Sequence, residues 1–281
     1  MTGAFTGDPA VKAELLDRLT THAANGTLRF GVTAWDGQGG TPLGVSTQGG
    51  DVADYAARFG YPLALAGLLD PMTAYAAPDR AVDTALAWVT AVDVGADLSA
   101  VPERIVHDLL EAMEADRLAA AYHAELRQLY RAEMSGTPPT RRDWADLRNR
   151  IAQATEEEPP TSDVRTALTA CVTACWPLAT SSSVLPTLFS VWFRDVNRRP
   201  DPEFCDASRE LAYAKLDEIY QETQPLRDTG QSVDIPALFR TRDPTLAAAF
   251  EGQLARSNAR YRARAQTVPD LVLAHLASPG A

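Results

Sequence analysis

A long stretch without charge is the feature that most constrains this chain. Residues 166–193, TALTACVTACWPLATSSSVLPTLFSVWF, contain no charged side chain. A stretch of this kind either spans a membrane or lies inside a folded protein. A spanning helix needs about 20 consecutive apolar residues, but Pro177 and Pro186 divide this stretch, and the run TSSS between them is typical of a turn. We therefore expect two buried helices joined by a turn, and no membrane span.

Four Asp-Pro pairs mark expected helix starts along the chain: Asp8-Pro9, Asp70-Pro71, Asp201-Pro202 and Asp243-Pro244. An aspartate caps free N–H groups of the first turn, and a proline suits the next position because it has no N–H to satisfy. The spacing of apolar residues predicts helices over 9–24, 51–60, 62–69, 79–93, 102–134, 141–154, 163–176, 184–196, 202–224, 244–266 and 269–277. The predicted fold is mainly α, a multi-helix soluble bundle.

Residues 27–47, TLRFGVTAWDGQGGTPLGVST, differ from this helical pattern. Two β-prone runs flank a glycine-rich turn, which predicts one small β-hairpin near the N-terminus. Further along, residues 155–162 are acidic and contain two consecutive prolines, which is typical of a linker. We expect this linker to join a helical subdomain over 1–154 to a second over 163–281, although a single compact domain fits the sequence equally well.

The amino-acid composition limits the kinds of binding partner and the cellular compartment that we expect for this protein. With 26 basic and 37 acidic residues, the net charge is −11. An acidic surface repels phosphate backbones, so we expect no general nucleic-acid binding. Arginine outnumbers lysine 24 to 2, which indicates a GC-rich genome and a bacterial source. The chain begins without a signal-peptide pattern and has three cysteines, so we expect a cytoplasmic protein whose Cys171 and Cys175 are buried free thiols.

Familiar catalytic motifs are missing from the sequence. A P-loop needs a lysine after its glycines, but neither Lys12 nor Lys215 follows a glycine-rich loop. The segment DGQGGTPLG has Pro42 where a dinucleotide fingerprint has its third glycine. In GVSTQG, the glycines stand at the wrong spacing from Ser46 for a nucleophile elbow. Whether the protein is an enzyme is therefore left open, and no cofactor is indicated.

One row of polar residues is a candidate metal or catalytic site. The row consists of Glu103, His107, Glu111 and Glu114. These residues share one face of the predicted helix 102–134, because they recur at spacings of four, four and three. Glu103, His107 and Glu111 could hold a divalent metal, or Glu111 could orient His107 for acid-base catalysis. The carboxylates that could complete a metal site lie on predicted helix 202–224: Asp217, Glu218 and Glu222. The alternative is a solvated helix face.

A basic stripe on the last long helix is a candidate binding surface. Arg256, Arg260 and Arg264 recur at a spacing of four, and residues 238–266 carry six arginines against two acidic residues. A local basic face on an acidic protein can bind an anion or the acidic surface of a partner. Because Arg256 is two residues from the apolar Leu254, we expect the stripe to point away from the core.

Two hypotheses for the function follow. The first is a protein-interaction or self-assembly module, with a protein partner or a second copy bound through such helix faces. The second is an enzyme or small-molecule binder with a ligand or metal site among its helices, whose polar groups come from the His107 region or from Tyr122 and His123. Charged side chains that turn inward toward a cavity favour the second hypothesis, and the same side chains in solvent favour the first.

Overall fold

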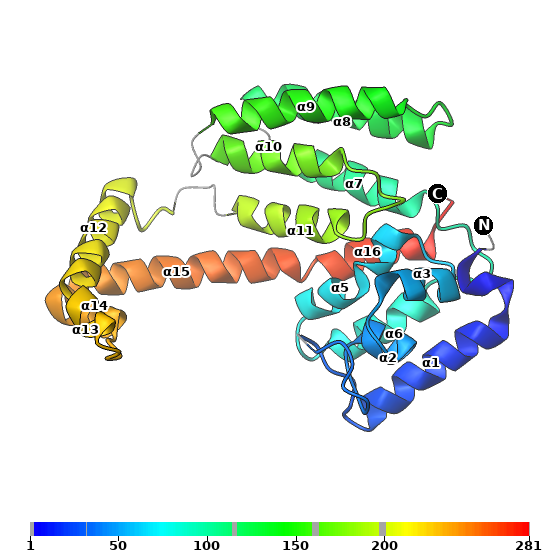
Figure 1. The fold of residues 1–281 in the computed structure, drawn as a ribbon, viewed down its shortest axis with the longest axis horizontal. Coiled ribbons are helices and arrows are strands. Elements are labelled where there is room, and N and C mark those ends of the chain that lie inside the picture. The colour runs from blue at the N-terminus through cyan, green and yellow to red at the C-terminus, as the bar shows by residue number, and fades with distance from the viewer. Residues whose placement is uncertain (1–2, 32, 114–116, 159–162, 197–200, 281) are drawn as a thin grey trace. The chain divides into compact units, whose positions relative to one another are not determined.

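The computed structural model describes residues 3–31, 33–113, 117–158, 163–196 and 201–280. Within these residues the chain is mainly helical, which confirms the predicted α class (Figure 1). The helices form two compact units. Unit 1 comprises Met1–Asp195 and Arg264–Ala281, and unit 2 comprises Val196–Ala263. The segment predicted as a linker, 155–162, lies within unit 1, and its residues 159–162 are outside the described ranges.

The N-terminal part of unit 1 consists of short helices around an aromatic core. Its elements are η1 (Ala4–Gly7), α1 (Pro9–Ala24), α2 (Pro42–Thr47), α3 (Val52–Phe59), α4 (Leu63–Ala66), α5 (Leu69–Tyr75) and α6 (Ala81–Thr90), and α16 (Val268–Ala277) packs against α5 and α6. At the centre, Tyr61 stacks on Trp88 with ring centroids 5.4 Å apart. Trp88 Nε1 donates a hydrogen bond to the Tyr55 hydroxyl at 3.1 Å, so this core buries its polar atoms in pairs.

Two of the four Asp-Pro pairs begin helices as predicted. Asp8 caps α1 and Asp243 caps α15 (Pro244–Ala265), and each carboxylate accepts a backbone N–H of the first turn. The other two aspartates bind residues distant in sequence. Asp70 lies within α5 and accepts the N–H of Leu43 at the start of α2 (2.9 Å), whereas Asp201 is buried and pairs with an arginine of α15. The Asp-Pro pattern is local, so it does not reveal such partners.

The predicted β-hairpin over 27–47 is wrong, because the described residues of this segment form isolated β-bridges and no strand. Thr41 and Pro42 instead start α2: the Thr41 side chain accepts the N–H of Gly44 at 3.2 Å, and Pro42 takes the first helical position. The glycines allow close packing of the backbone. A Cβ on Gly44 would lie 1.6 Å from the carbonyl oxygen of Ala34. Glycine is therefore needed at this position for the close contact between α2 and the backbone of Ala34, and not for a hairpin turn.

Two helices, α7 (Val101–Ala112) and α8 (Arg117–Met134), replace the predicted single helix 102–134. The first ends where Met113 adopts extended backbone geometry, with φ −82° and ψ 125°. The two helices pack against each other, so their apolar faces share one core. The apolar spacing is the same in one long helix as in two helices joined by a short break, which is why the spacing alone did not reveal the break.

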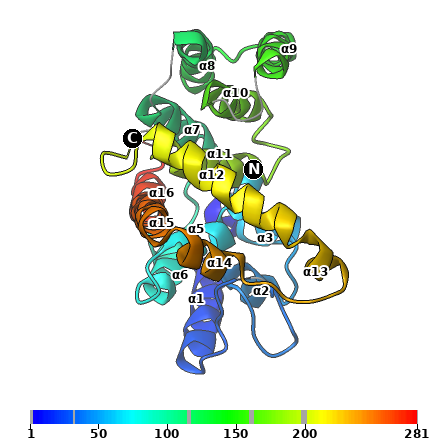
Figure 2. The ribbon, with the colours of Figure 1, turned by 90° about the vertical axis from the view of Figure 1, so that its left-hand side faces the viewer.

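Three helices, α8, α9 (Arg141–Glu157) and α10 (Asp163–Ala174), pack together, and Figure 2 shows them nearly end-on. The uncharged stretch 166–193 forms α10, a turn and α11 (Val184–Asp195), as expected. Cys171 and Cys175 on this stretch are buried free thiols. Among the helices of the described residues, none is both long enough and apolar enough to cross a membrane.

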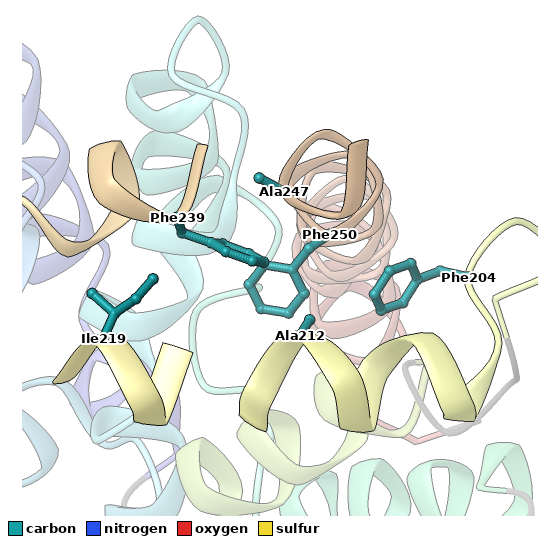
Figure 3. Close-up of a cluster of buried hydrophobic side chains, with 6 residues drawn as sticks. All are labelled: Phe204, Ala212, Ile219, Phe239, Ala247 and Phe250. Carbon is teal, nitrogen blue, oxygen red and sulfur yellow. The ribbon is translucent and has the colours of Figure 1, made fainter. Parts of the chain in front are cut away.

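Unit 2 has its own small hydrophobic core. It contains α12 (Asp206–Glu222), α13 (Gln224–Asp228), α14 (Ile235–Arg242) and most of α15. Figure 3 shows its buried side chains: Phe204, Ala212, Ile219, Phe239, Ala247 and Phe250. Phe250 lies between the other aromatic rings, with its centroid 6.0 Å from that of Phe204 and 6.2 Å from that of Phe239. This aromatic cluster joins α12, α14 and α15.

Candidate functional site

A cavity of about 600 Å³ in unit 1 is the candidate functional site. Glu103 of α7, Tyr130 and Glu133 of α8, and four residues of α9 line it together with residues 175–180, which follow α10. The packing of α8, α9 and α10 therefore brings the turn of the uncharged stretch against polar residues of three helices. A volume of this size is typical of small-molecule sites.

Aromatic side chains form one wall of the cavity. Tyr130 and Trp144 meet edge to face with ring centroids 5.1 Å apart, and the Tyr130 hydroxyl donates a hydrogen bond to the Ala174 carbonyl at 2.6 Å. Trp176 also lines the cavity and is 50% exposed. The guanidinium of Arg148 lies over the Trp176 ring, 4.4 Å from its centroid. Large aromatic surfaces beside a cavity provide contact area for an apolar or planar ligand.

Glu103 provides an inward-facing carboxyl group. Its Oε2 is buried and makes no hydrogen bond to any described residue. Burial raises the pKa of Glu103 from 4.5 to about 7, and the nearby carboxylate of Glu133 adds to this effect. Glu103 therefore changes its charge near neutral pH, so it can donate a proton, accept one, or bind a cation.

The other reactive groups of the cavity are held in their neutral forms. Burial raises the pKa of the Cys175 thiol to about 12, and burial raises the pKa of the Tyr130 hydroxyl well above its usual value. A nucleophilic cysteine needs a lowered pKa, because the thiolate is the reactive form. The arrangement therefore supports binding and proton exchange at Glu103, and gives no support for covalent catalysis at Cys175.

His107 and Glu111, the other members of the predicted metal triad, belong to a network of ion pairs. Ligand atoms of His107, Asp108 and Glu111 lie within 4.8 Å of one another. However, Arg131 Nε donates to His107 Nε2 at 3.2 Å, and Glu111 Oε1 accepts from Arg127 and Arg131 at 2.8 and 3.1 Å. Two guanidinium groups repel a metal cation. This geometry favours an electrostatic link between α7 and α8 over a metal centre, and Glu103 is directed to the cavity.

The remaining acidic and histidine candidates lie outside the cavity lining. His123 is buried on α8, and Glu114 is outside the described residues. The carboxylates suggested as further metal ligands belong to α12 in unit 2: Asp217, Glu218 and Glu222. There Glu218 pairs with Lys215 at 2.8 Å, so it has a cationic partner within its own helix.

The predicted basic stripe of Arg256, Arg260 and Arg264 is engaged by its own chain. Arg256 donates two hydrogen bonds to Asp201 at 3.0 and 3.1 Å. Arg260 lies 3.8 Å from the same carboxylate, whose side chain is 1% exposed. The Arg256 guanidinium holds the pKa of Asp201 below its usual value. Arg264 donates to the Trp192 carbonyl at 3.2 Å. The stripe therefore has partners within the chain and does not simply point into solvent.

No protein-family model, curated protein or solved structure matches this chain. The assignment of the candidate site is therefore based on the geometry of the structure. Of the cavity's polar and aromatic residues, the sequence identified Glu103 only. Trp144, Arg148 and Trp176 were missed, because their positions in the sequence do not show that α9 and the turn after α10 meet beside α7.

Proposed function

We propose that this protein binds a small organic molecule in the cavity between α7, α8, α9 and residues 175–180. The observation that carries the proposal is the Glu103 carboxyl group, which lines a cavity of about 600 Å³ while its Oε2 has no hydrogen-bond partner among the described residues. A buried polar atom without a partner costs about 1–3 kcal/mol. A bound ligand that supplies the missing partner offsets this cost.

The half-exposed Trp176 supports the same proposal. Its exposed ring lines the same cavity as Trp144 and Tyr130, so these aromatic rings together offer contact area to a ligand. The ion pairs of unit 1 support it too: Glu111 has two arginine partners, whereas Glu103 has no arginine partner among the described residues. The inward carboxyl group thus favours the small-molecule hypothesis over the interaction hypothesis.

A thermal-shift screen of small organic acids, amines and neutral aromatics tests this function. A ligand that binds only the native state raises its melting temperature as its concentration rises. We expect hits on the wild type that are lost in Trp176→Ala and kept in Trp35→Phe, a control outside the cavity lining. The intrinsic fluorescence of Trp144 and Trp176 should change with each hit. If no compound shifts the wild type, or if Trp176→Ala retains every shift, the cavity does not have this function.

Exposed apolar side chains on α12 support a second candidate function, the protein-interaction role. Leu211, Tyr213 and Tyr220 are 51%, 57% and 48% exposed. Tyr213 and Tyr220 are seven residues apart and so share one helix face. The double substitution Tyr213→Ser with Tyr220→Ser should weaken the binding of a protein partner or of a second copy to this face. Light scattering and crosslinking would measure the loss of association. A strictly monomeric wild type without crosslinked species argues against self-association through this face.

A further inference from the structure

Opposite charges line the cavity of unit 1 without neutralising one another. Glu103 and Glu133 come from α7 and α8, whereas Arg141 and Arg148 come from α9. Among the described residues, none of these four side chains forms an ion pair. Other charged residues of the same helices do pair, as Arg142 does with Asp146 at 3.4 Å. The cavity therefore presents both an acidic side and a basic side to whatever occupies it.

Arg148 is oriented to bind an anionic group. Its guanidinium stacks over Trp176 at 4.4 Å, and stacking uses the face of the planar group while its N–H donors remain in the plane. Its side chain donates no hydrogen bond to another described residue. The fixed fork of N–H groups matches the two oxygens of a carboxylate, so the stack on Trp176 holds Arg148 ready for bidentate binding.

Glu103 is placed to bind the opposite charge. An ammonium group has three N–H donors and a positive charge, so it supplies the hydrogen bond that the carboxyl group lacks. Because an adjacent cation favours the charged form of a carboxyl group, such a ligand would lower the pKa of Glu103 on binding. The aromatic surfaces of Trp144 and Tyr130 lie on the same cavity wall, where they can contact the apolar part of a ligand.

We propose that the ligand is a small zwitterion, an amino acid or short peptide with an apolar side chain. Its ammonium group binds Glu103, its carboxylate binds Arg148, and its side chain contacts Trp144 and Trp176. This inference rests on the proposed function of the cavity. A ligand with only a negative charge meets repulsion from Glu133 and the ionised Glu103, and a simple cation or metal ion meets repulsion from Arg141 and Arg148. A zwitterion complements both sides.

Isothermal titration calorimetry with four matched probes tests the inference: L-phenylalanine, glycyl-L-phenylalanine, phenethylamine and 3-phenylpropanoate. The first two are zwitterions of different length, and the last two carry only the ammonium or only the carboxylate. We expect one zwitterion to bind at least about tenfold more tightly than either singly charged probe. We also expect its affinity to rise between about pH 6 and about pH 8, because Glu103, with a pKa of about 7, becomes charged over that range.

Two substitutions test the contacts of the ligand's two charged ends separately. Glu103→Gln should weaken binding of the zwitterion and phenethylamine about tenfold or more, and it should not weaken binding of 3-phenylpropanoate, because the substitution removes a repelling charge. Arg148→Gln should weaken binding of the zwitterion and 3-phenylpropanoate, and it should not weaken binding of phenethylamine. Arg142→Gln, an exposed residue of the same helix, is the control and should change nothing. Circular dichroism spectra confirm that each variant is folded.

The outcomes also separate this inference from the proposed function. If a singly charged or neutral compound binds as tightly as the zwitterions, or if Glu103→Gln and Arg148→Gln leave zwitterion binding intact, the ligand class is wrong. A hit from the thermal-shift screen that depends on Trp176 would then still support the cavity as a binding site. If neither experiment finds any ligand, both the ligand class and the proposed function are wrong.

Discussion

At the residue scale, the pKa of a carboxyl group depends on whether it has a hydrogen-bond or ion-pair partner. Glu103 and Glu111 are two turns apart on α7. Glu111 accepts hydrogen bonds from two arginines, while Glu103 turns toward the cavity and has a buried oxygen without a partner among the described residues. Desolvation disfavours the charged form of a carboxyl group that has no compensating partner. The raised pKa of Glu103 therefore follows from its position beside the cavity.

The pKa of Glu103 predicts how stability depends on pH. Its folded value of about 7 lies above its ordinary value of 4.5, so the folded state binds more protons between these values. Stability from this group is then present below about pH 4.5 and is lost as the pH rises through 7. The loss amounts to at most about 3.5 kcal/mol, because each pKa unit between the two values corresponds to about 1.4 kcal/mol. Glu103→Gln should remove this component.

Urea unfolding of the wild type and the variant at about pH 5 and about pH 8 measures the effect. The free energy of unfolding should fall more with pH in the wild type than in Glu103→Gln, which should be the more stable of the two at the higher pH. Glu133→Gln, at an exposed position on the same cavity, should keep most of the wild-type pH dependence, because burial is the larger cause of the raised pKa of Glu103 and the Glu133 carboxylate only adds to it. Parallel pH profiles for the wild type and Glu103→Gln would contradict the raised pKa.

At the element scale, the sequence predicted what depends on local interactions. Helix starts at Asp8 and Asp243 could be predicted because capping involves neighbouring residues. The start of α2 has a local signal of the same kind in Thr41 and Pro42, although the segment around it was interpreted as a hairpin. The α7–α8 break could not be predicted, because the apolar spacing is the same with or without it. The close packing of Gly44 on Ala34 could not be predicted either, because it is a contact between separate segments. The same reason explains the site: Glu103 was found on a helix face, but its neighbours Trp144 and Arg148 are about 40 residues away along the chain.

Gly44 offers a test of the packing that replaces the predicted hairpin. A Cβ at this position would lie 1.6 Å from the Ala34 carbonyl oxygen, which is backbone and cannot move aside easily. Gly44→Ala should therefore lower the free energy of unfolding by about 2 kcal/mol or more. Gly49→Ala is the matched control, because its nearest neighbour would be a side-chain oxygen 3.8 Å away. Chemical denaturation measures both, and equal stability of the two variants would mean that α2 does not pack this closely.

At the scale of the whole molecule, the two units have separate cores and unequal sizes. Unit 1 contains all five tryptophans of the chain, Trp35, Trp88, Trp144, Trp176 and Trp192. Unit 2 depends on the small aromatic cluster around Phe250. A segment of this length buries a smaller share of its surface than a large domain and is correspondingly less stable. The candidate ligand site lies in unit 1, so a change confined to the core of unit 2 should leave ligand binding intact.

Phe250→Ala tests whether the units unfold separately. Removing a buried phenylalanine leaves a cavity and costs about 3–5 kcal/mol, and this ring contacts three other aromatic rings of unit 2. Circular dichroism at far-ultraviolet wavelengths follows the helices of both units, whereas tryptophan fluorescence follows unit 1 only. We expect the variant to lose part of its helical signal at a lower temperature while the fluorescence transition stays in place. Leu254→Ala, at a position on the same helix that is 42% exposed, should shift neither transition appreciably. If Phe250→Ala lowers the fluorescence transition by as much as the helical one, the two units unfold as one cooperative structure, and stability at the cavity then depends on the core of unit 2.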